Sequence, residues 1–270
     1  MIEPVLRPED HAAWESWQRT ARMHARTPLH RSRIDRAKRI VSECIDRTPK
    51  TVVMWSGGKD STTLVHLTCV EMGCRIPVLS EKDDLDFPGE RAYVEGLGHR
   101  WGLDLRIVTP DISPIDWLRS HRDEIVAGDD MHSRAAGLSK ACFYQVVERA
   151  SEGYEAILLG LRSEESRGRR MNRATRGPTY RKASGQWSCS PLVDWTGLDV
   201  MAYMASQDID PLPLYRCISF AHAREPWRVR KSWWLPGASA SKGQMSWLRR
   251  YYPSLYQQAH DLVQHAQSLA

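Results

Sequence analysis

A short apolar run, followed directly by a glycine-rich turn and an amphipathic segment, constrains the fold of this chain most strongly. The run 51–55 follows the helix breaker Pro49 and predicts a buried strand. The turn 56–61 contains two adjacent glycines, and the segment 60–72 then carries apolar residues at helical spacing until Gly73 stops it. The sequence therefore predicts a strand, a tight turn and a helix in direct succession.

Strands and helices are expected to alternate through the central part of the chain. Further short apolar runs predict strands at 76–79, 105–108 and 156–160, and amphipathic stretches predict helices at 89–101, 137–151 and 196–207. Such alternation is typical of a parallel sheet with helices on both faces. We therefore expect an α/β fold built on a Rossmann-like, doubly wound parallel sheet.

The two ends of the chain have a different pattern. Apolar positions at helical spacing predict a helical N-terminal extension over residues 1–48, and residues 214–270 predict a small, mainly helical C-terminal part. The nucleotide-binding α/β domain would then span residues 49–213. A chain of 270 residues with 41% hydrophobic residues can bury one large core or a core with a small appendage.

Composition excludes several classes of protein. The N-terminus lacks a basic segment followed by an apolar core, and no apolar stretch is long enough to cross a bilayer, so we expect a cytoplasmic protein without a membrane partner. Its six cysteines form no C-x-x-C pair, which argues against a zinc knuckle, an iron-sulfur cluster and a redox dithiol. We expect scattered, reduced thiols.

The turn 56–61 has the features of a phosphate-binding loop. A glycine turn between a buried strand and a helix gathers backbone N–H groups around one anion and adds the positive end of the helix dipole. The P-loop pattern G-x-x-x-x-G-K-[ST] does not fit, because Asp60 follows Lys59, and the dinucleotide pattern G-x-G-x-x-G is absent. A chance turn is the alternative, which the flanking strand and helix disfavour.

Four ordered segments resemble one family. Residues 56–61 resemble the PP-loop motif S-G-G-x-D-S of the adenine nucleotide alpha-hydrolase-like superfamily, which includes ATP pyrophosphatases, tRNA thiolation enzymes and PAPS reductases. Residues 86–90, 160–166 and 190–196 resemble the F-P-E-T, G-[LI]-R-x-x-[EQ]-S and P-L-x-D-W-T segments of PAPS reductases, although Gly89 interrupts the first. The resemblance covers about residues 50–215 and implies the adenine nucleotide alpha-hydrolase-like fold.

The resemblance implies a site for an adenine nucleotide, with ATP and Mg²⁺ as the expected cofactors. Its nucleotide-binding residues would be Ser56, Gly57, Gly58, Lys59, Asp60, Ser61, Thr62, Gly160, Arg162 and Ser166. The C-terminal E-C-G-x-H segment that carries the nucleophilic cysteine of PAPS reductases is missing, as are the paired cysteines of many APS reductases. The sequence therefore favours cleavage of ATP over sulfonucleotide reduction.

Three charged residues are candidates for catalysis. Lys59 can neutralise charge on the β or γ phosphate, its alternative being a surface lysine. Asp60 can orient the loop or hold Mg²⁺ through water, and a helix N-terminal carboxylate is an equal alternative. Arg162 follows a predicted buried strand, where open α/β sheets bind ligands, and is the candidate cation for the transition state.

Three other segments contain polar or charged residues for which the sequence leaves alternative roles open. The arginine-rich segment 162–182, with Arg167, Arg169 and Arg170 as candidate phosphate contacts, suits a mobile loop over a polyanion or a solvated charged loop. The aspartates at 83, 84 and 86 suit a metal, a ribose or an acidic turn. The segment 224–234 interleaves aromatic and basic residues, as nucleic-acid-binding surfaces do, but tryptophans also join small lobes to a core.

These observations support three functional hypotheses. The first is an ATP pyrophosphatase that adenylates an acceptor for sulfur transfer, with a nucleic acid or a sulfur-donor protein as a possible partner. The second is a PAPS-type reductase that uses an unusual thiol, for which Cys189 and Cys217 are candidates, although inert packing is the commoner role of a single cysteine. The third is a nucleotide-responsive, nucleic-acid-binding subunit.

Overall fold

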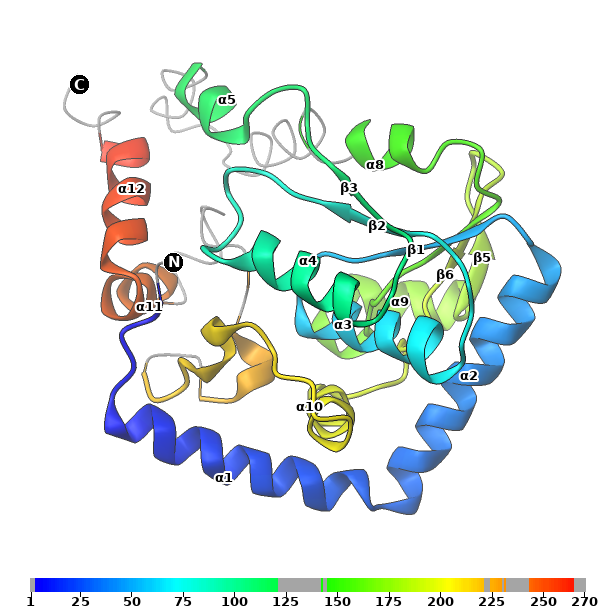
Figure 1. Cartoon of the computed structure of the whole chain (residues 1–270), viewed down its shortest axis with the longest axis horizontal. Coiled ribbons are helices and arrows are strands. Elements are labelled where there is room, and N and C mark those ends of the chain that lie inside the picture. The colour runs from blue at the N-terminus through cyan, green and yellow to red at the C-terminus, as the bar shows by residue number, and fades with distance from the viewer. Residues whose placement is uncertain are drawn as a thin grey trace.

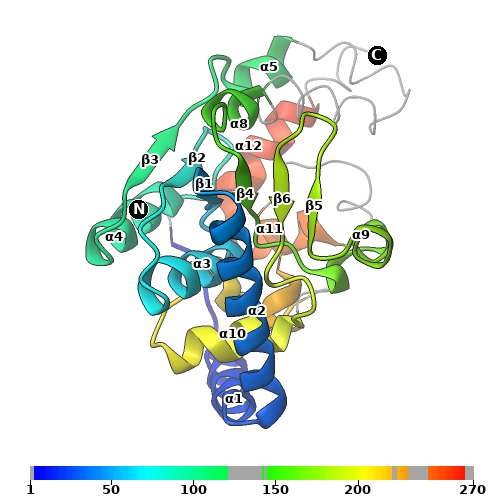
Figure 2. The same cartoon turned by 90° about the vertical axis from the view of Figure 1, so that its right-hand side faces the viewer.

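A six-stranded sheet forms the centre of the computed structural model, which describes residues 3–120, 142, 145–220, 224–229, 231 and 243–264. The strand order is β3-β2-β1-β4-β6-β5, as Figure 2 shows. The strands are β1 (Thr51–Met54), β2 (Val78–Glu81), β3 (Leu105–Val108), β4 (Ala156–Leu158), β5 (Thr179–Arg181) and β6 (Trp187–Cys189). All neighbours pair in parallel except β5, which runs antiparallel to β6. The predicted α/β fold is confirmed, and the edge strand β5 departs from the expected parallel arrangement.

The direction of winding reverses beside β1. From β1 the chain adds β2 and β3 on one side, and β4 then pairs with the other side of β1. In open α/β sheets, ligands bind outside the carboxyl ends of the strands at such a switch point. The segments that follow β1 and β4 therefore occupy the position where a nucleotide is expected.

One face of the sheet packs against four helices. They are α2 (Pro28–Arg47), α3 (Lys59–Val65), α4 (Glu90–Arg100) and α10 (Gly197–Ser206). Side chains of a strand alternate between its faces, so Val53 and Trp55 point into this core while Val52 points to the other face. Figure 2 shows α2 crossing in front of the strands.

The opposite face has a smaller described core. Val52, Leu79 and Ile157 are buried there, with Ala150 and Tyr154 packed against them. The helix expected over 137–151 is described as α8 (Gln145–Ala150); residues 137–141 and 143–144 lie outside the described residues. The predicted strand 76–79 lies instead at 78–81, because Pro77 has no N–H to donate to a neighbouring strand.

The N-terminal extension is helical, as predicted. It consists of α1 (Pro8–Ala25), which packs along α10, and α2, and Figure 1 shows the two helices along the lower and right-hand edges. The Thr27 hydroxyl accepts the N–H of His30, and Pro28 is the first residue of α2, so the sequence fixes where α2 begins.

The C-terminal part is also mainly helical. It contains the 3₁₀ turns η4 (Pro213–Arg216) and η5 (Pro226–Arg228) and the helices α11 (Gln244–Tyr251) and α12 (Pro253–Gln264). The elements η4, α11 and α12 share a second core with Leu85 and Phe87, which follow β2. The remaining elements are η1 (His66–Glu71), α5 (Pro114–Ser120), η3 (Ser163–Glu165) and α9 (Arg167–Arg176). The domain boundaries at residues 48 and 213 stay predictions.

Candidate nucleotide site

The loop after β1 has a fixed shape. Gly57 has a φ of +76°, which favours glycine, and a Cβ at this position would lie 3.1 Å from Glu90 Cγ. The hydroxyls of Ser56 and Ser61 are 3.0 Å apart, and the Ser61 hydroxyl donates to the Gly58 carbonyl at 3.0 Å. The chain continues as α3 and then, without a break, as the π-helix η1, so the loop leads into one helical segment over residues 59–71.

Three charged side chains meet beside this loop. The Lys59 ammonium donates to Asp60 Oδ2 at 2.7 Å, and Arg162 Nε donates to Asp60 Oδ1 at 2.5 Å. Lys59 is 4% exposed and Arg162 2% exposed. Burial raises the pKa of Asp60, but Lys59 and Arg162 outweigh it and hold that pKa below its usual value. This triad of side chains carries one net positive charge, and Arg162 also contacts the carboxylate of Glu164.

Gly160 brings Arg162 to the loop. It follows β4, and a Cβ at this position would lie 2.8 Å from Ser61 N and 2.9 Å from Asp60 C. The backbone after β4 thus touches the first turn of α3, and only glycine permits that approach. Sequence reasoning included Gly160 through the family resemblance; the structure supplies this steric reason for a glycine there.

The predicted motif segments converge on the triad. Arg162 Nη1 donates to Glu164 Oε2 at 2.5 Å, and the same oxygen accepts the N–H of Gly197 at 2.6 Å. The N–H of Ser163 donates to the Val193 carbonyl at 2.9 Å. The segment 160–166 is therefore tied to the segment 190–196 and to the start of α10.

Two lysines support the loop from the other side: Lys82, which sequence reasoning missed, and Lys231, which it included in the segment 224–234 without placing it at this loop. The Lys82 ammonium donates to Glu90 Oε1 at 2.6 Å and to the Ser56 carbonyl at 3.4 Å, and the Lys231 ammonium donates to the same two oxygens. Glu90 is fully buried. Lys82 directly follows β2, a position that could have marked it, whereas nothing in the sequence near Lys231 indicates this contact.

The aspartates after β2 form an acidic turn. Asp83 Oδ1 accepts the N–H of Leu85 at 2.7 Å, and Asp86 Oδ2 accepts the N–H of Asp83 at 3.2 Å. Burial and the neighbouring Asp83 and Asp86 raise the pKa of Glu81 to about 8. These oxygens already serve the turn, so the structure favours that alternative over a metal or ribose site.

Thr62 and Ser166 have structural partners. The Thr62 hydroxyl accepts the indole N–H of Trp55 at 2.9 Å inside the core, and the Ser166 hydroxyl accepts the N–H of Arg169 at 3.1 Å, capping α9. Their roles in nucleotide binding stay predictions, as do those of the other nucleotide-binding candidates.

The prediction of a mobile loop over the arginine-rich segment 162–182 is wrong for most of that segment. Residues 167–176 form α9, which Ser166 caps and Gly177, with a φ of +76°, ends; arginine is a good helix former. Arg169 is paired with Glu165, and Arg173 with Asp194. Among the described residues, the exposed Arg167 and Arg170 have no ion-pair partner.

The other segments expected to carry chemistry pack into the interior. Cys189 and Cys217 are fully buried. Burial and the nearby Asp10 raise the pKa of Cys217, so the thiolate is disfavoured. In the segment 224–234, Trp227 packs against Trp17 with ring centroids 4.7 Å apart, which is the packing alternative; positions 230 and 232–234 lie outside the described residues.

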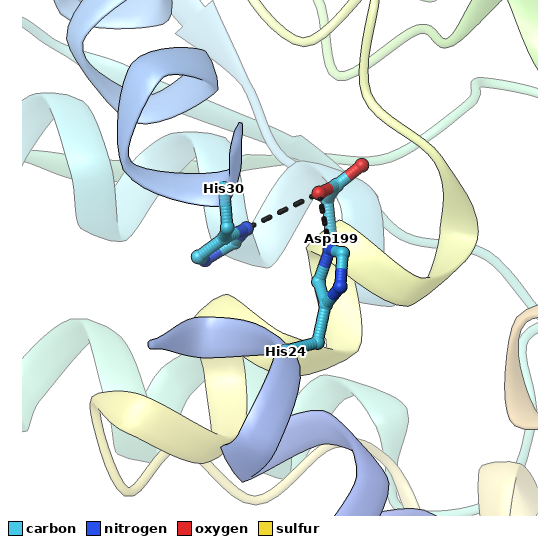
Figure 3. A group of neighbouring side chains, drawn as sticks. All are labelled: His24, His30 and Asp199. Atoms are coloured by element: carbon cyan, nitrogen blue, oxygen red, sulfur yellow. Dashed lines mark hydrogen bonds and ion pairs between the residues drawn. The ribbon is translucent and has the colours of Figure 1, made fainter. Parts of the chain in front are cut away.

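A histidine pair lies on the N-terminal side of α10. Figure 3 shows His24 and His30 directed at Asp199, whose Oδ1 lies 2.8 Å from His24 Nε2 and 3.2 Å from His30 Nδ1. Asp199 Oδ2 accepts from Arg33 and from Thr196. These contacts hold α1, α2 and α10 together.

Within the described residues, these three side chains are the group whose ligand atoms could hold a metal, all within 4.8 Å of one another. A metal-bound imidazole normally donates its other N–H to a partner, but His30 Nε2 has none. The positive charge of Arg33, which is bonded to Asp199, would also repel a metal cation. We therefore interpret the group as a hydrogen-bonded anchor.

Comparison with known proteins shows the family of this chain. Residues 50–218, more than half of the chain, match the model of the phosphoadenosine phosphosulfate reductase domain. The chain belongs to the phosphoadenosine phosphosulfate reductase family. Within this family it is similar to a phosphoadenosine 5'-phosphosulfate reductase of Thiocapsa roseopersicina, with 27% identity over 66% of this chain and 73% of the relative.

A second kind of relative has a different name. Sulfate adenylyltransferase subunit 2 of Burkholderia lata is 25% identical over 65% of this chain and 64% of its own length. The match therefore spans less than two thirds of that relative. Among solved structures, PAPS reductase of Candida auris has a TM-score of 0.50 at 16% identity, covering 65% of this chain and 81% of its own.

FMN adenylyltransferase of Candida glabrata has a TM-score of 0.51 at 15% identity, covering 77% of this chain and 70% of its own. At such identities the two structures show the fold alone. No helix in the described part of the chain is long and apolar enough to cross a membrane.

Proposed function

We propose that this chain binds ATP at the loop 56–61 and cleaves it between the α and β phosphates, transferring the adenylyl group to an acceptor. The observation that carries the proposal is the buried triad of Lys59, Asp60 and Arg162 at the switch point between β1 and β4. Buried cations beside a phosphate loop are placed to stabilise charge that moves onto a leaving group.

The chemistry needs few groups from the protein. An acceptor oxygen attacks the α phosphorus, the bond between that phosphorus and the α–β bridging oxygen breaks, and pyrophosphate leaves with the electron pair. The Lys59 ammonium and the Arg162 guanidinium neutralise the negative charge that develops on pyrophosphate. Asp60 positions both cations, because each of its oxygens holds one of them.

We propose sulfate as the acceptor, because the name of one relative, sulfate adenylyltransferase subunit 2, describes adenylyl transfer to sulfate. Sulfur transfer to a nucleic acid, or from a sulfur-donor protein, stays a prediction. The cytoplasmic location also stays a prediction. Both Asp60 oxygens are occupied by cations, so Asp60 does not fit a direct metal ligand in this arrangement. We propose instead that Mg²⁺ arrives as part of the MgATP substrate.

Pyrophosphate release tests the proposal. Purified protein would be incubated with MgATP, with and without sulfate, and pyrophosphate measured by a coupled assay. Lys59→Ala should lose the activity by about 100-fold or more, the usual effect of removing one group that stabilises developing charge. Lys50→Ala, a change at an exposed lysine directly before β1, is the matched control and should keep it. Equal activity in both variants would contradict the proposal.

Sulfonucleotide reduction is the second candidate, favoured by the name of the matched domain and of the first relative. It needs an accessible thiolate, and both candidate cysteines are fully buried. Sulfite released from PAPS, and lost on Cys217→Ser or Cys189→Ser, would establish it in place of ATP cleavage.

A further inference from the structure

Tyr215 places a phenol hydroxyl against the phosphate loop. It belongs to η4 in the C-terminal part and is 2% exposed. Its oxygen accepts the N–H of Lys59 at 3.3 Å, and a Cβ added to Gly58 would lie 3.4 Å from the same oxygen. The hydroxyl therefore touches two backbone positions of the loop, although 156 residues separate it from Lys59 in sequence.

The hydrogen of this hydroxyl is not used within the described part of the chain. A phenol can accept one hydrogen bond and donate another. Tyr215 accepts from Lys59, but no described residue accepts its own hydrogen. A buried donor without an acceptor is costly, so such a group indicates a missing partner.

The surroundings of Tyr215 suit an anionic partner. The Lys59 ammonium lies 5.3 Å from the centre of its ring. Burial and the nearby Asp60 carboxylate raise the pKa of Tyr215, so the hydroxyl keeps its hydrogen at neutral pH. A neutral hydroxyl donor beside an ammonium resembles the donor sets that bind phosphate oxygens.

We infer that the Tyr215 hydroxyl is a phosphate-binding group of the nucleotide site, accepting the Lys59 amide and donating its hydrogen to a phosphate oxygen of the bound nucleotide. The inference rests on the proposed function, because both use the loop 56–61. It gives the C-terminal part a direct role in the site, because η4 adds a donor from outside the α/β core.

Calorimetric titration of three ligands tests this assignment. ATP, pyrophosphate and adenosine would be titrated into the wild type, Tyr215→Phe and Tyr251→Phe. Tyr215→Phe keeps the ring over Lys59 and removes only the oxygen. Tyr251 is the matched control, because it is fully buried in the same C-terminal core but its hydroxyl donates to Asp10 Oδ1 at 2.7 Å.

We expect Tyr215→Phe to bind ATP and pyrophosphate about tenfold or more weakly, the effect of one hydrogen bond to a charged group, and to bind adenosine as the wild type does. Tyr251→Phe should bind all three ligands normally. Thermal melting would establish that both variants fold. Unchanged ATP affinity in Tyr215→Phe, or an equal loss for adenosine, would overturn the inference while ATP binding by the wild type stands. A wild type that binds neither ATP nor pyrophosphate would overturn the proposed function and this inference together.

Discussion

Replacing Gly160 by alanine should displace the phosphate loop without touching any charged group. The added methyl would lie 2.8 Å from Ser61 N and 2.9 Å from Asp60 C. An ordinary contact needs about 3.4 Å, so the segment after β4 and the start of α3 must separate by roughly 0.6 Å. Neither group is the end of a flexible side chain, so a rotamer change cannot relieve the overlap.

Overpacking of this kind costs about 1–3 kcal/mol, which corresponds to a fall of roughly 2–10 °C in melting temperature for a chain of this size. Misplacement of catalytic groups by about 1 Å can cost about 100-fold in rate, so activity should fall by roughly 10–100-fold. Gly96→Ala is the control, because Gly96 lies in α4 with nothing within 4 Å of its Cβ position. Melting curves and pyrophosphate-release assays of both variants are the measurements. A Gly160→Ala protein that melts and releases pyrophosphate like Gly96→Ala would refute the close approach of the segment after β4 to α3.

Three other changes test the surrounding charges. Arg162→Lys cannot keep the bonds of the guanidinium to both Asp60 and Glu164, so steady-state kinetics should show kcat about 100-fold lower. Asp199→Asn should lower the free energy of unfolding at pH 7 by about 3 kcal/mol in urea titrations, because it removes a fully buried carboxylate that holds Arg33, His24 and His30. Burial opposes ionisation of Asp199, but its hydrogen bonds outweigh this effect and lower its pKa. The difference in unfolding free energy between the wild type and Asp199→Asn should therefore shrink as the pH falls below 3.8. A difference that stays constant with pH would contradict this role of Asp199. Glu81 has its pKa raised from 4.5 to about 8, so the folded state binds the extra proton and wild-type stability should fall as the pH rises between these values. Glu81→Gln should remove this fall of stability with pH. Identical stability–pH profiles of the variant and the wild type would contradict the raised pKa of Glu81.

Local patterns were sufficient to predict the centre of the fold. The strand 51–54, the glycine turn and the helix after it were all readable from residues adjacent in sequence, because burial and helix spacing act locally. The helix 197–206 was equally clear, since threonine is a preferred helix N-cap residue and Thr196 precedes it. The structure adds a capping box between Thr196 and Asp199. Arg162 could be expected near the loop because it follows a buried strand of a parallel sheet.

Contacts between distant segments could not be predicted in this way. Lys231 reaches Glu90 from 141 residues away, and Tyr215 reaches Lys59 from 156 residues away. Nothing near Tyr215 in the sequence distinguishes it from an ordinary core tyrosine. The basic segment was misinterpreted for a different reason. Its glycines and charges suggested a loop, whereas Ser166 caps a helix, Arg169 pairs with Glu165 one turn earlier, and Arg173 finds Asp194 only in the folded chain.

Identifying the phosphorus–oxygen bond that breaks in ATP is the most direct test of the proposed reaction. ATP labelled at the α phosphate would be incubated with the protein, Mg²⁺ and sulfate, and the labelled products separated by chromatography. Label in AMP or in an adenylated acceptor, with an equal amount of pyrophosphate and loss of both in Lys59→Ala, is the result we predict. Label in ADP with release of inorganic phosphate would contradict the account, because cleavage would then fall between the β and γ phosphates.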